Sequence, residues 1–314
     1  MNPTDSRPTF SRPTVLALDV GGTKLEAGVV RPGGELLSRR RVATGTGTAE
    51  ELFAEVLGLL RAVLGEAQVD VDAIGVGCGG PMTGPDPSDA AGGAATVSPL
   101  NIAQWREFPL GPRLAAEFGL PVRVDNDAKA LALGEGALGA AKGVDAYLAM
   151  VVSTGVGGGI VLDGRLLDGA AGNAGHIGHV IVEPRGRECV CGARGCLEAE
   201  VSGTAIAEVT GRPAAEAPLE WRIRTGRLVG RAVGSVCNLL DLRLAVVAGS
   251  VAIGFGEPFL AAARSELSRV ARLGFSEGAE IRIGSLAGDG PLLGAAEVGF
   301  VRLGLADPPP SGGR

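Results

Sequence analysis

The sequence predicts an α/β protein of two lobes, built on a β-β-β-α-β unit that occurs twice. In the first copy, Val15–Val20, "LEAGVV" and "GGELLSRRRV" are short strand-like runs separated by glycine turns, and a helical pattern at 49–64 precedes the strand "VDAIGVGC". The same order begins again near residue 146, with "AYLAMVV", "GIVLDG" and "GRLLDG" before a helix at about 223–240 and the strand "LAVVAGS". With 314 residues and 46% hydrophobic content, each copy can bury its own core. We therefore expect two similar halves that face one another across a cleft.

The two copies set the expected domain boundaries. Residues 1–13 and 304–314 are rich in proline and polar residues and are predicted to be disordered tails. Residues 14–125 should form the smaller lobe, completed by the C-terminal helix. Residues 126–303 should form the larger lobe, with a zinc-binding insert at 176–198.

Two helices can be described further. The helix at 49–64 has one apolar face, formed by Leu52, Val56, Leu59, Leu60 and Val63. Between the two copies, "LPVRVDNDAKALALGEGAL" predicts a strand, a turn and an amphipathic helix, with Asp125 or Asn126 as its cap. This segment is the expected crossover between the lobes.

Charge and composition exclude several classes of partner. The net charge of -6 is spread along the chain without basic clusters, which argues against nucleic acid and anionic membranes as partners. The N-terminal segment lacks the apolar run of a signal peptide, and the apolar stretch Tyr147–Leu162 is shorter than the ~20 residues of a spanning helix. We therefore expect a cytoplasmic protein.

Cys78 and Cys237 stand alone in apolar segments and are expected in the core.

The turn "DVGGTK" is a candidate phosphate site. Asp19 ends a buried strand, and Gly21, Gly22 and Thr23 can direct backbone N–H groups at a phosphate while Asp19 holds Mg²⁺ directly or through water. "STGVGGG" at 153–159 is a second turn of this kind, at the matching place in the second copy. A single glycine-rich turn is more often just a hairpin turn, so the prediction depends on the pair.

Other nucleotide-binding motifs do not fit. The sequence has no Gly-Lys-Ser/Thr P-loop, and the "GVGCGG" match at 75–80 is followed by Pro81 where a dinucleotide-binding fold requires a helix. The segment 79–100 is long and rich in proline and glycine, which is typical of a binding loop or of disorder.

Asp127 is a candidate general base. It follows a short strand and falls in the first turn of a helix, where backbone N–H groups and the helix dipole favour an ionised carboxylate. Capping of the helix by "DND" is the alternative role for the same residues.

The most specific signal is a set of one histidine and three cysteines. His179, Cys189, Cys191 and Cys196 supply a complete tetrahedral ligand set for zinc, which leaves no open position and indicates a structural site. A disulfide and buried free thiols are the alternatives. The first is disfavoured by the expected compartment, and the second by the charged residues nearby.

Taken together, the motifs resemble the ROK family of sugar kinases and sugar-responsive repressors. The resemblance runs from "LALDVGGTK" through "VSTGVGGGI" and "GHIGHVIVEPRGRECVCGARGCLEAEVSG" to "GDGPLLGAA". It implies an actin-like ATPase (ribonuclease H-like) fold, with ATP, Mg²⁺ and a sugar bound between the lobes, and a homodimer or homotetramer.

The resemblance also assigns roles to residues. Asn126 and Asp127 match the family's sugar-binding pair, whose aspartate takes the proton of the sugar's 6-hydroxyl. His179, although a zinc ligand, and Glu198 match further sugar contacts, so the zinc is expected to order the sugar pocket. Two further residues, Asn101 and Gly80, are also assigned to the sugar site. The nucleotide and its metal are assigned to Asp19, Gly21, Gly22, Thr23, Lys24, Ser153, Thr154, Gly155, Gly157, Gly249 and Ser250.

Two residues depart from the family pattern. Glucokinases of the family usually have glutamate at the place of His176, and "AGHIGH" resembles kinases of N-acetylhexosamines. Histidine can donate a hydrogen bond to the carbonyl of a 2-acetamido group, so we expect N-acetylglucosamine or N-acetylmannosamine as substrate, with glucose as the alternative. The alternative role for His176 is packing. Ser250 stands where the family tends to have glycine near the adenosine.

Two further function classes stay open. A repressor of the family carries an N-terminal helix-turn-helix, for which the eighteen residues before Asp19 are expected to be too few. A sugar-binding protein without catalysis is disfavoured by Asp127 and the two phosphate turns.

Polyphosphate replaces ATP in some relatives. "SRRR" at 38–41 is expected to be a solvated strand end.

Overall fold

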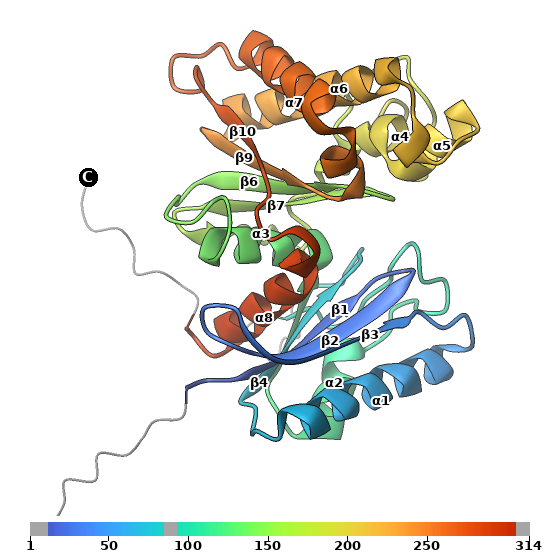
Figure 1. Ribbon diagram of the computed structural model, residues 1–314, viewed down its shortest axis with the longest axis vertical. Helices are drawn as coiled ribbons and strands as arrows, with labels where there is room; N and C mark the ends of the chain where they lie inside the picture. Colours follow the sequence, from blue (N-terminus) through green and yellow to red (C-terminus); the bar gives the residue numbers. More distant parts are fainter. Residues whose placement is uncertain (1–11, 85–92, 306–314) are drawn as a thin grey trace, which may run out of the picture.

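The computed structural model describes residues 12–84 and 93–305 and contains two five-stranded sheets of identical topology (Figure 1). The first sheet has the order β3 (Glu35–Ala43), β2 (Lys24–Arg31), β1 (Val15–Val20), β4 (Ala73–Cys78), β5 (Val122–Asn126). The second has the order β10 (Glu280–Ile283), β9 (Leu244–Ala248), β6 (Tyr147–Val152), β7 (Val156–Leu162), β8 (Arg165–Leu166). In both sheets the first three strands are antiparallel neighbours and the other two run parallel to the first. The predicted repeat is confirmed.

Each sheet has helices on both faces. The outer face of the first sheet packs against α1 (Ala49–Ala67) and α2 (Leu110–Phe118), and that of the second against α6 (Leu219–Leu240) and α7 (Ser250–Val270). The predicted apolar face of α1 is buried throughout, and Thr48 and Glu51 form a capping box at its start. Cys78 and Cys237 are buried in these two cores, as expected. We call each sheet with its outer helices the first and the second lobe.

Two helices cross between the sheets (Figure 1). Helix α3 (Asp127–Ala137) directly follows β5 of the first sheet but packs mainly against β6 and β7 of the second. Helix α8 (Gly290–Arg302) follows the second sheet but packs against β1 and β4 of the first. The two helices also contact each other, so each lobe is closed by a helix that comes from the other half of the sequence.

The prediction that α3 is amphipathic is wrong. Buried residues lie on nearly every side of this helix, including the charged Lys129 and Glu135. A helix between two sheets has little solvent-facing surface, and the small residues of "DAKALALGEGA" allow this close packing. Asn126 is the cap, because its side chain accepts a hydrogen bond from the N–H of Ala128 at 3.0 Å.

Further elements belong to the second lobe or lie outside the described residues. Between β8 and α6 the chain forms the excursion of residues 176–198, which was predicted to bind zinc, and the helices α4 (Leu197–Val201) and α5 (Gly203–Thr210). In the part of the chain that the structure describes, no helix is both long and apolar enough to cross a membrane. Most of the two predicted tails, and residues 85–92 of the predicted binding loop, lie outside the described residues.

Because α3 and α8 cross closely, replacing glycine by alanine should change the free energy of unfolding in opposite directions in α8 and in α1. A methyl group at Gly294 of α8 would lie 2.4 Å from the carbonyl oxygen of Ala130 in α3, whereas at Gly58 of α1 it would meet nothing within 4 Å. Gly294→Ala should lower the free energy of unfolding by about 1–3 kcal/mol. Gly58→Ala should raise it by about 0.5–1 kcal/mol, because alanine favours an exposed helix. Urea denaturation of both variants measures these changes, and equal stabilisation by both would contradict the close crossing.

Candidate active site

The first predicted phosphate turn connects β1 and β2. The N–H of Gly21 donates to the carbonyl of Lys24 at 3.0 Å, which closes the hairpin. Asp19, at the end of β1, is 5% exposed. Burial, and next the negative charge of Asp127, raise the pKa of the Asp19 carboxyl to about 7. A divalent cation beside this carboxylate would favour its ionised form, so the site fits Mg²⁺ by its chemistry.

The second turn lies at the matching place between β6 and β7. The N–H of Ser153 donates to the carbonyl of Gly155 at 2.9 Å, and Thr204 at the start of α5 donates to the carbonyl of Thr154. The hydroxyl groups of Ser153 and Ser250 lie 3.0 Å apart, so the unusual serine at 250 is joined directly to this turn.

Gly249 caps α7 next to the second turn. Its φ of 100° lies in the region that favours glycine, and a methyl group there would lie 2.4 Å from the carbonyl oxygen of Val152. The start of α7 therefore approaches the second turn as closely as backbone atoms allow. Helix N-termini favour anions, which suits a nucleotide phosphate at this place.

Asp127 is the first residue of α3 and lies at the boundary between the two lobes. Its carboxylate accepts a hydrogen bond from the N–H of Ala128 at 2.8 Å, while Asn126 provides the cap. The residue is exposed to solvent. Desolvation by the surrounding protein nevertheless raises the pKa of its carboxyl, and backbone hydrogen bonds partly offset this rise. A raised pKa makes the carboxylate a better proton acceptor.

Three predicted sugar contacts come together from three separate segments. A methyl group at Gly80 would lie 3.4 Å from Nδ2 of Asn126 and 3.7 Å from Cε1 of His176. Asn101 lies farther toward the nucleotide turn, because methyl groups at Gly79 and Gly22 would lie 3.4 Å and 2.9 Å from its side chain. The predicted sugar residues therefore adjoin the predicted phosphate turn.

Glu198 links the sugar residues to the second turn. One of its carboxylate oxygens accepts a hydrogen bond from the N–H of Val156 at 2.8 Å. Burial lowers the pKa of His176, and so does His179, while the charge of Glu198 acts in the opposite direction. The rings of His176 and His179 are 6.0 Å apart between centroids. His176, His179 and Glu198 are thus neighbours.

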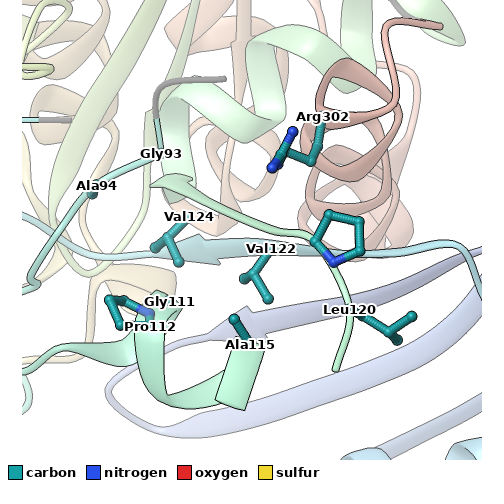
Figure 2. A pocket seen from close by; sticks show the side chains of 10 residues that line it. Gly93, Ala94, Gly111, Pro112, Ala115, Leu120, Val122, Val124 and Arg302 are labelled. Atoms are coloured by element: carbon teal, nitrogen blue, oxygen red, sulfur yellow. The ribbon is translucent and has the colours of Figure 1, made fainter. Parts of the chain in front are cut away.

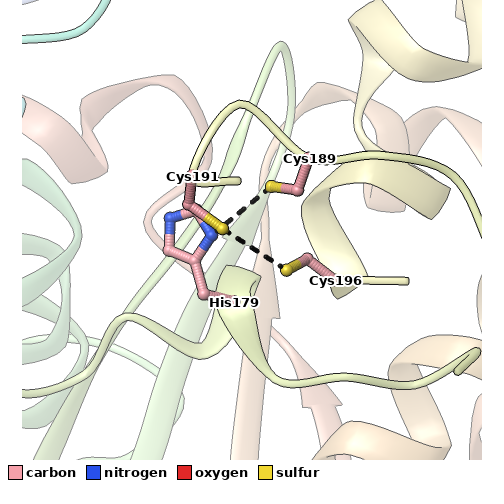
Figure 3. Close-up of side chains that lie close together, drawn as sticks. All are labelled: His179, Cys189, Cys191 and Cys196. Carbon is pink, nitrogen blue, oxygen red and sulfur yellow. Dashed lines mark hydrogen bonds between the residues drawn. The ribbon is translucent and has the colours of Figure 1, made fainter. Parts of the chain in front are cut away.

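The predicted zinc ligands form a cluster (Figure 3). The ligand atoms of His179, Cys189, Cys191 and Cys196 all lie within 4.8 Å of one another. The sulfur atoms of Cys191 and Cys196 are 3.7 Å apart, as are the Cys189 sulfur and Nδ1 of His179. Around a tetrahedral ion, zinc–sulfur bonds of about 2.3 Å would place two sulfur atoms about 3.8 Å apart. The cluster therefore fits zinc.

The environment of the thiols differs within the cluster, and backbone hydrogen bonding lowers the pKa of Cys191. Burial raises the pKa of the Cys189 thiol and, to about 12, that of Cys196. A bound cation would stabilise the thiolates that burial disfavours. The loop has little core of its own, since Val190 at its tip is 84% exposed. Four ligands would therefore supply much of what holds this loop in shape.

The arginines of "SRRR" are exposed, as predicted, but they lie within β3 and two of them also have a buried partner. Arg39 and Arg41 form ion pairs with Glu26, whose side chain is fully buried, and Lys24 approaches the same carboxylate at 3.1 Å. Burial tends to raise the pKa of Glu26, but hydrogen bonds from these cations outweigh it and lower the pKa. Arg39 also reaches Asp289 at 2.6 Å. The alternation of arginines along β3 was the available signal, because it places both on one face.

Two cavities of about 270 Å³ each lie among the described residues, one apart from the predicted site residues and one close to them. The first, between α2, β5 and Arg302 of α8, is lined by none of the predicted site residues (Figure 2). The second lies between the lobes and is lined by Asp125, Lys129 and Asp168. Sequence reasoning missed Lys129, and it also missed Asn173, which hydrogen-bonds to both backbone groups of Met82.

The sequence matches a known family over most of its length. Residues 15–299 match the ROK family. The chain belongs to the ROK family. It is 36% identical over 268 residues to a protein of Yersinia pseudotuberculosis serotype O:1b (strain IP 31758) named N-acetylmannosamine kinase, covering 80% of this chain and 88% of the relative.

Solved structures of ROK proteins share the fold. The ROK hexokinase from Thermus thermophilus has a TM-score of 0.77 and 33% identity, over 93% of this chain and 99% of that one. A ROK family glucokinase from Streptomyces griseus, in complex with glucose and AMPPNP, has a TM-score of 0.76 and 30% identity, over 91% and 99% of the two chains. The predicted family, the actin-like ATPase fold and the sugar kinase type of enzyme are confirmed.

The cluster predicts one bound zinc ion per chain. Cys196→Ser should lose this ion, and the midpoint temperature of unfolding should fall by several degrees because the excursion loses its cross-link. Metal analysis by mass spectrometry and a thermal melt measure the two effects. Cys237→Ala is the matched control, since it removes a buried thiol of α6 and should leave the zinc content unchanged. Wild-type protein purified without chelators but free of zinc would refute the prediction.

Proposed function

We propose that this ROK protein transfers the γ-phosphoryl group of ATP to the 6-hydroxyl of an N-acetylhexosamine. The observation that carries the proposal is the position of Asp127, at the start of α3, beside both Asp19 and the cluster of Gly80, Asn126 and His176. A base, a metal-binding carboxylate and the sugar contacts therefore meet at one place. The two glycine turns and the start of α7 supply N–H groups for the phosphates.

The transfer then requires few chemical steps from the protein. Asp127 accepts the proton of the 6-hydroxyl as the bond from that oxygen to the γ-phosphorus forms. The bond from this phosphorus to the β–γ bridging oxygen breaks, and ADP leaves with the electron pair. Asn126 and His176 orient the sugar, while Asp19 would hold Mg²⁺. The metal, when bound, neutralises charge on the phosphates.

Two observations support an N-acetylhexosamine over glucose. His176 lies beside Gly80 and Asn126, where a ring N–H can donate to the carbonyl of a 2-acetamido group. The relative that is 36% identical is named N-acetylmannosamine kinase. Glucose stays the alternative substrate, because the Streptomyces griseus glucokinase, crystallised with glucose, is 30% identical.

Zinc has a supporting part in this proposal. With Nδ1 of His179 directed at the sulfur cluster, Nε2 is free to donate toward the sugar. Glu198 follows the ligand Cys196 by two residues and is held by Val156 at the second turn. The cluster thus fixes side chains of the sugar site, as outer ligands do in catalytic metal sites.

Replacement of Asp127 tests the catalytic step. Asp127→Ala should lower kcat by about 100-fold or more, because the proton acceptor is lost. Zinc content and thermal stability should stay close to the wild-type values. ADP release in a coupled assay measures the rate. Asp145→Asn is the control, since it changes an exposed aspartate elsewhere in the second lobe. Normal turnover by Asp127→Ala would show that the assigned role is wrong.

The pH profile adds a second readout to the same experiment. The pKa values of Asp19 and Asp127 are both raised, so both carboxylates protonate at a higher pH than ordinary aspartates. As the pH falls below about 7, Asp19 protonates and the enzyme loses the carboxylate that would hold the metal, while Asp127 protonates at a pH above the ordinary aspartate range. The kcat/KM of the wild type should therefore decline below about pH 7, well above the usual aspartate range near about 4.

A panel of sugars tests the substrate. The values of kcat/KM for N-acetylmannosamine and N-acetylglucosamine should exceed that for glucose by about tenfold or more, since an unpaired donor at His176 is costly. His176→Glu should reduce this ratio. A clear preference for glucose in the wild type would overturn the assignment. If no sugar of the panel led to ADP release, a sugar sensor without catalysis would be favoured instead.

A further inference from the structure

A buried lysine lies behind the candidate sugar contacts. The sequence has three lysines, and Lys129 on α3 is only 2% exposed. Its ammonium group lies 2.9 Å from Asp125 and 2.8 Å from Asp168, and donates to the carbonyl of Gly172 at 3.1 Å. These contacts use all three donors of the group, which is the condition under which lysine is found buried.

The two carboxylates come from different lobes. Asp125 is the last residue but one of β5 in the first sheet and is 5% exposed. It also accepts a hydrogen bond from the N–H of Asn126 at 2.9 Å. Asp168 lies beyond β8 of the second sheet, and its side chain is 53% exposed. Arg123 approaches Asp125 at 3.4 Å and Asp168 at 3.9 Å. The charges in this cluster are therefore paired across the boundary between the lobes.

The contacts of Lys129 in both lobes connect it to candidate sugar-binding residues. Through Asp125 it reaches the backbone of Asn126, and through Asp168 and Gly172 it holds the segment that leads to His176. That segment, "DGAAGNAGH", contains three glycines with positive φ and has little regular structure, so it depends on such contacts for its position.

The same segment is fixed to the third sugar contact. Asn173 accepts a hydrogen bond from the N–H of Met82 at 3.1 Å and donates to its carbonyl at 2.8 Å. Met82 follows Gly80 by two residues. The segment is therefore held on one side by Lys129 and on the other by the chain that carries Gly80.

We propose that Lys129 is a positioning residue that sets the separation of His176 from Asn126 and thereby the selectivity for the group on carbon 2 of the sugar. The inference rests on the proposed function, and assigns the lysine no contact with substrate. Breaking the contact to Asp168 would loosen the second-lobe segment on the side of Lys129, while Asn126 stays in place and Asn173 still holds Met82. His176 would then lose its fixed distance to the acetamido carbonyl, whereas the nucleotide turns would be unaffected.

The experiment compares Lys129→Met, Asp168→Asn and the double variant, with Lys142→Met as matched control because Lys142 is exposed. Calorimetry without nucleotide gives the affinity for N-acetylmannosamine and for glucose, and kinetics give the KM for ATP. Each single variant should weaken N-acetylmannosamine binding by about tenfold, weaken glucose less, and leave the KM for ATP within about twofold. The double variant should bind no more weakly than Lys129→Met alone, because Lys129→Met already removes the contact that Asp168→Asn weakens.

Asp168→Asn keeps the test valid if Lys129→Met does not fold, since it leaves the buried pair with Asp125 intact. Lower thermal stability with unchanged sugar selectivity in Asp168→Asn would overturn the inference. So would equal weakening of N-acetylmannosamine and glucose. Because affinity is measured without nucleotide, these results are independent of ADP release by the wild type, on which the proposed function depends.

Discussion

The close crossing of α3 and α8 is the constraint on which the arrangement of this molecule depends. Each helix leaves one sheet and packs on the other, and glycines at the crossing let the two backbones approach. A methyl group at Gly134 would lie 3.2 Å from the backbone of Gly294, and one at Gly75 of β4 only 2.0 Å from the carbonyl of Ala295. At such distances neither helix can rotate or shift without moving a sheet. The start of α3, which carries Asp127, is therefore fixed relative to both lobes.

The duplicated topology explains why the candidate catalytic elements lie at strand ends. In both sheets the first strand ends in a glycine turn, and the duplicated topology places the two turns at corresponding positions. Asp19 follows this rule in the first sheet, and Ser153 in the second. The side chains do not repeat, since the second turn is joined by Ser250 and Glu198 where the first has a carboxylate of its own. Similar frames thus carry different chemistry, one suited to a metal and the other to a nucleotide.

The sequence predicted well whatever depends on local pattern. The order of strands and helices along the chain, the apolar face of α1 and the ligand set around Cys196 follow from periodicity and spacing. The structure confirms the first two and brings the four ligands together. Features that depend on what packs against an element were missed. The burial of α3 on nearly every side and the burial of Lys129 cannot be predicted from the sequence of α3 alone. Both arise because a second sheet, distant in sequence, packs against this helix. Glu26 was missed because its three cations come from two strands.

The negative charge of Asp19 and Asp127 affects how phosphate groups can bind beside them. Burial, and next the negative charge of Asp127, raise the pKa of Asp19 to about 7, and the charge of Lys24 offsets this only in part. Phosphate groups would add negative charge at the same place. Lys24 and Arg41 supply positive charge near Asp19, but both are also paired with Glu26. A divalent cation that arrives with the nucleotide is therefore the physically reasonable way to bring the phosphates and both carboxylates together.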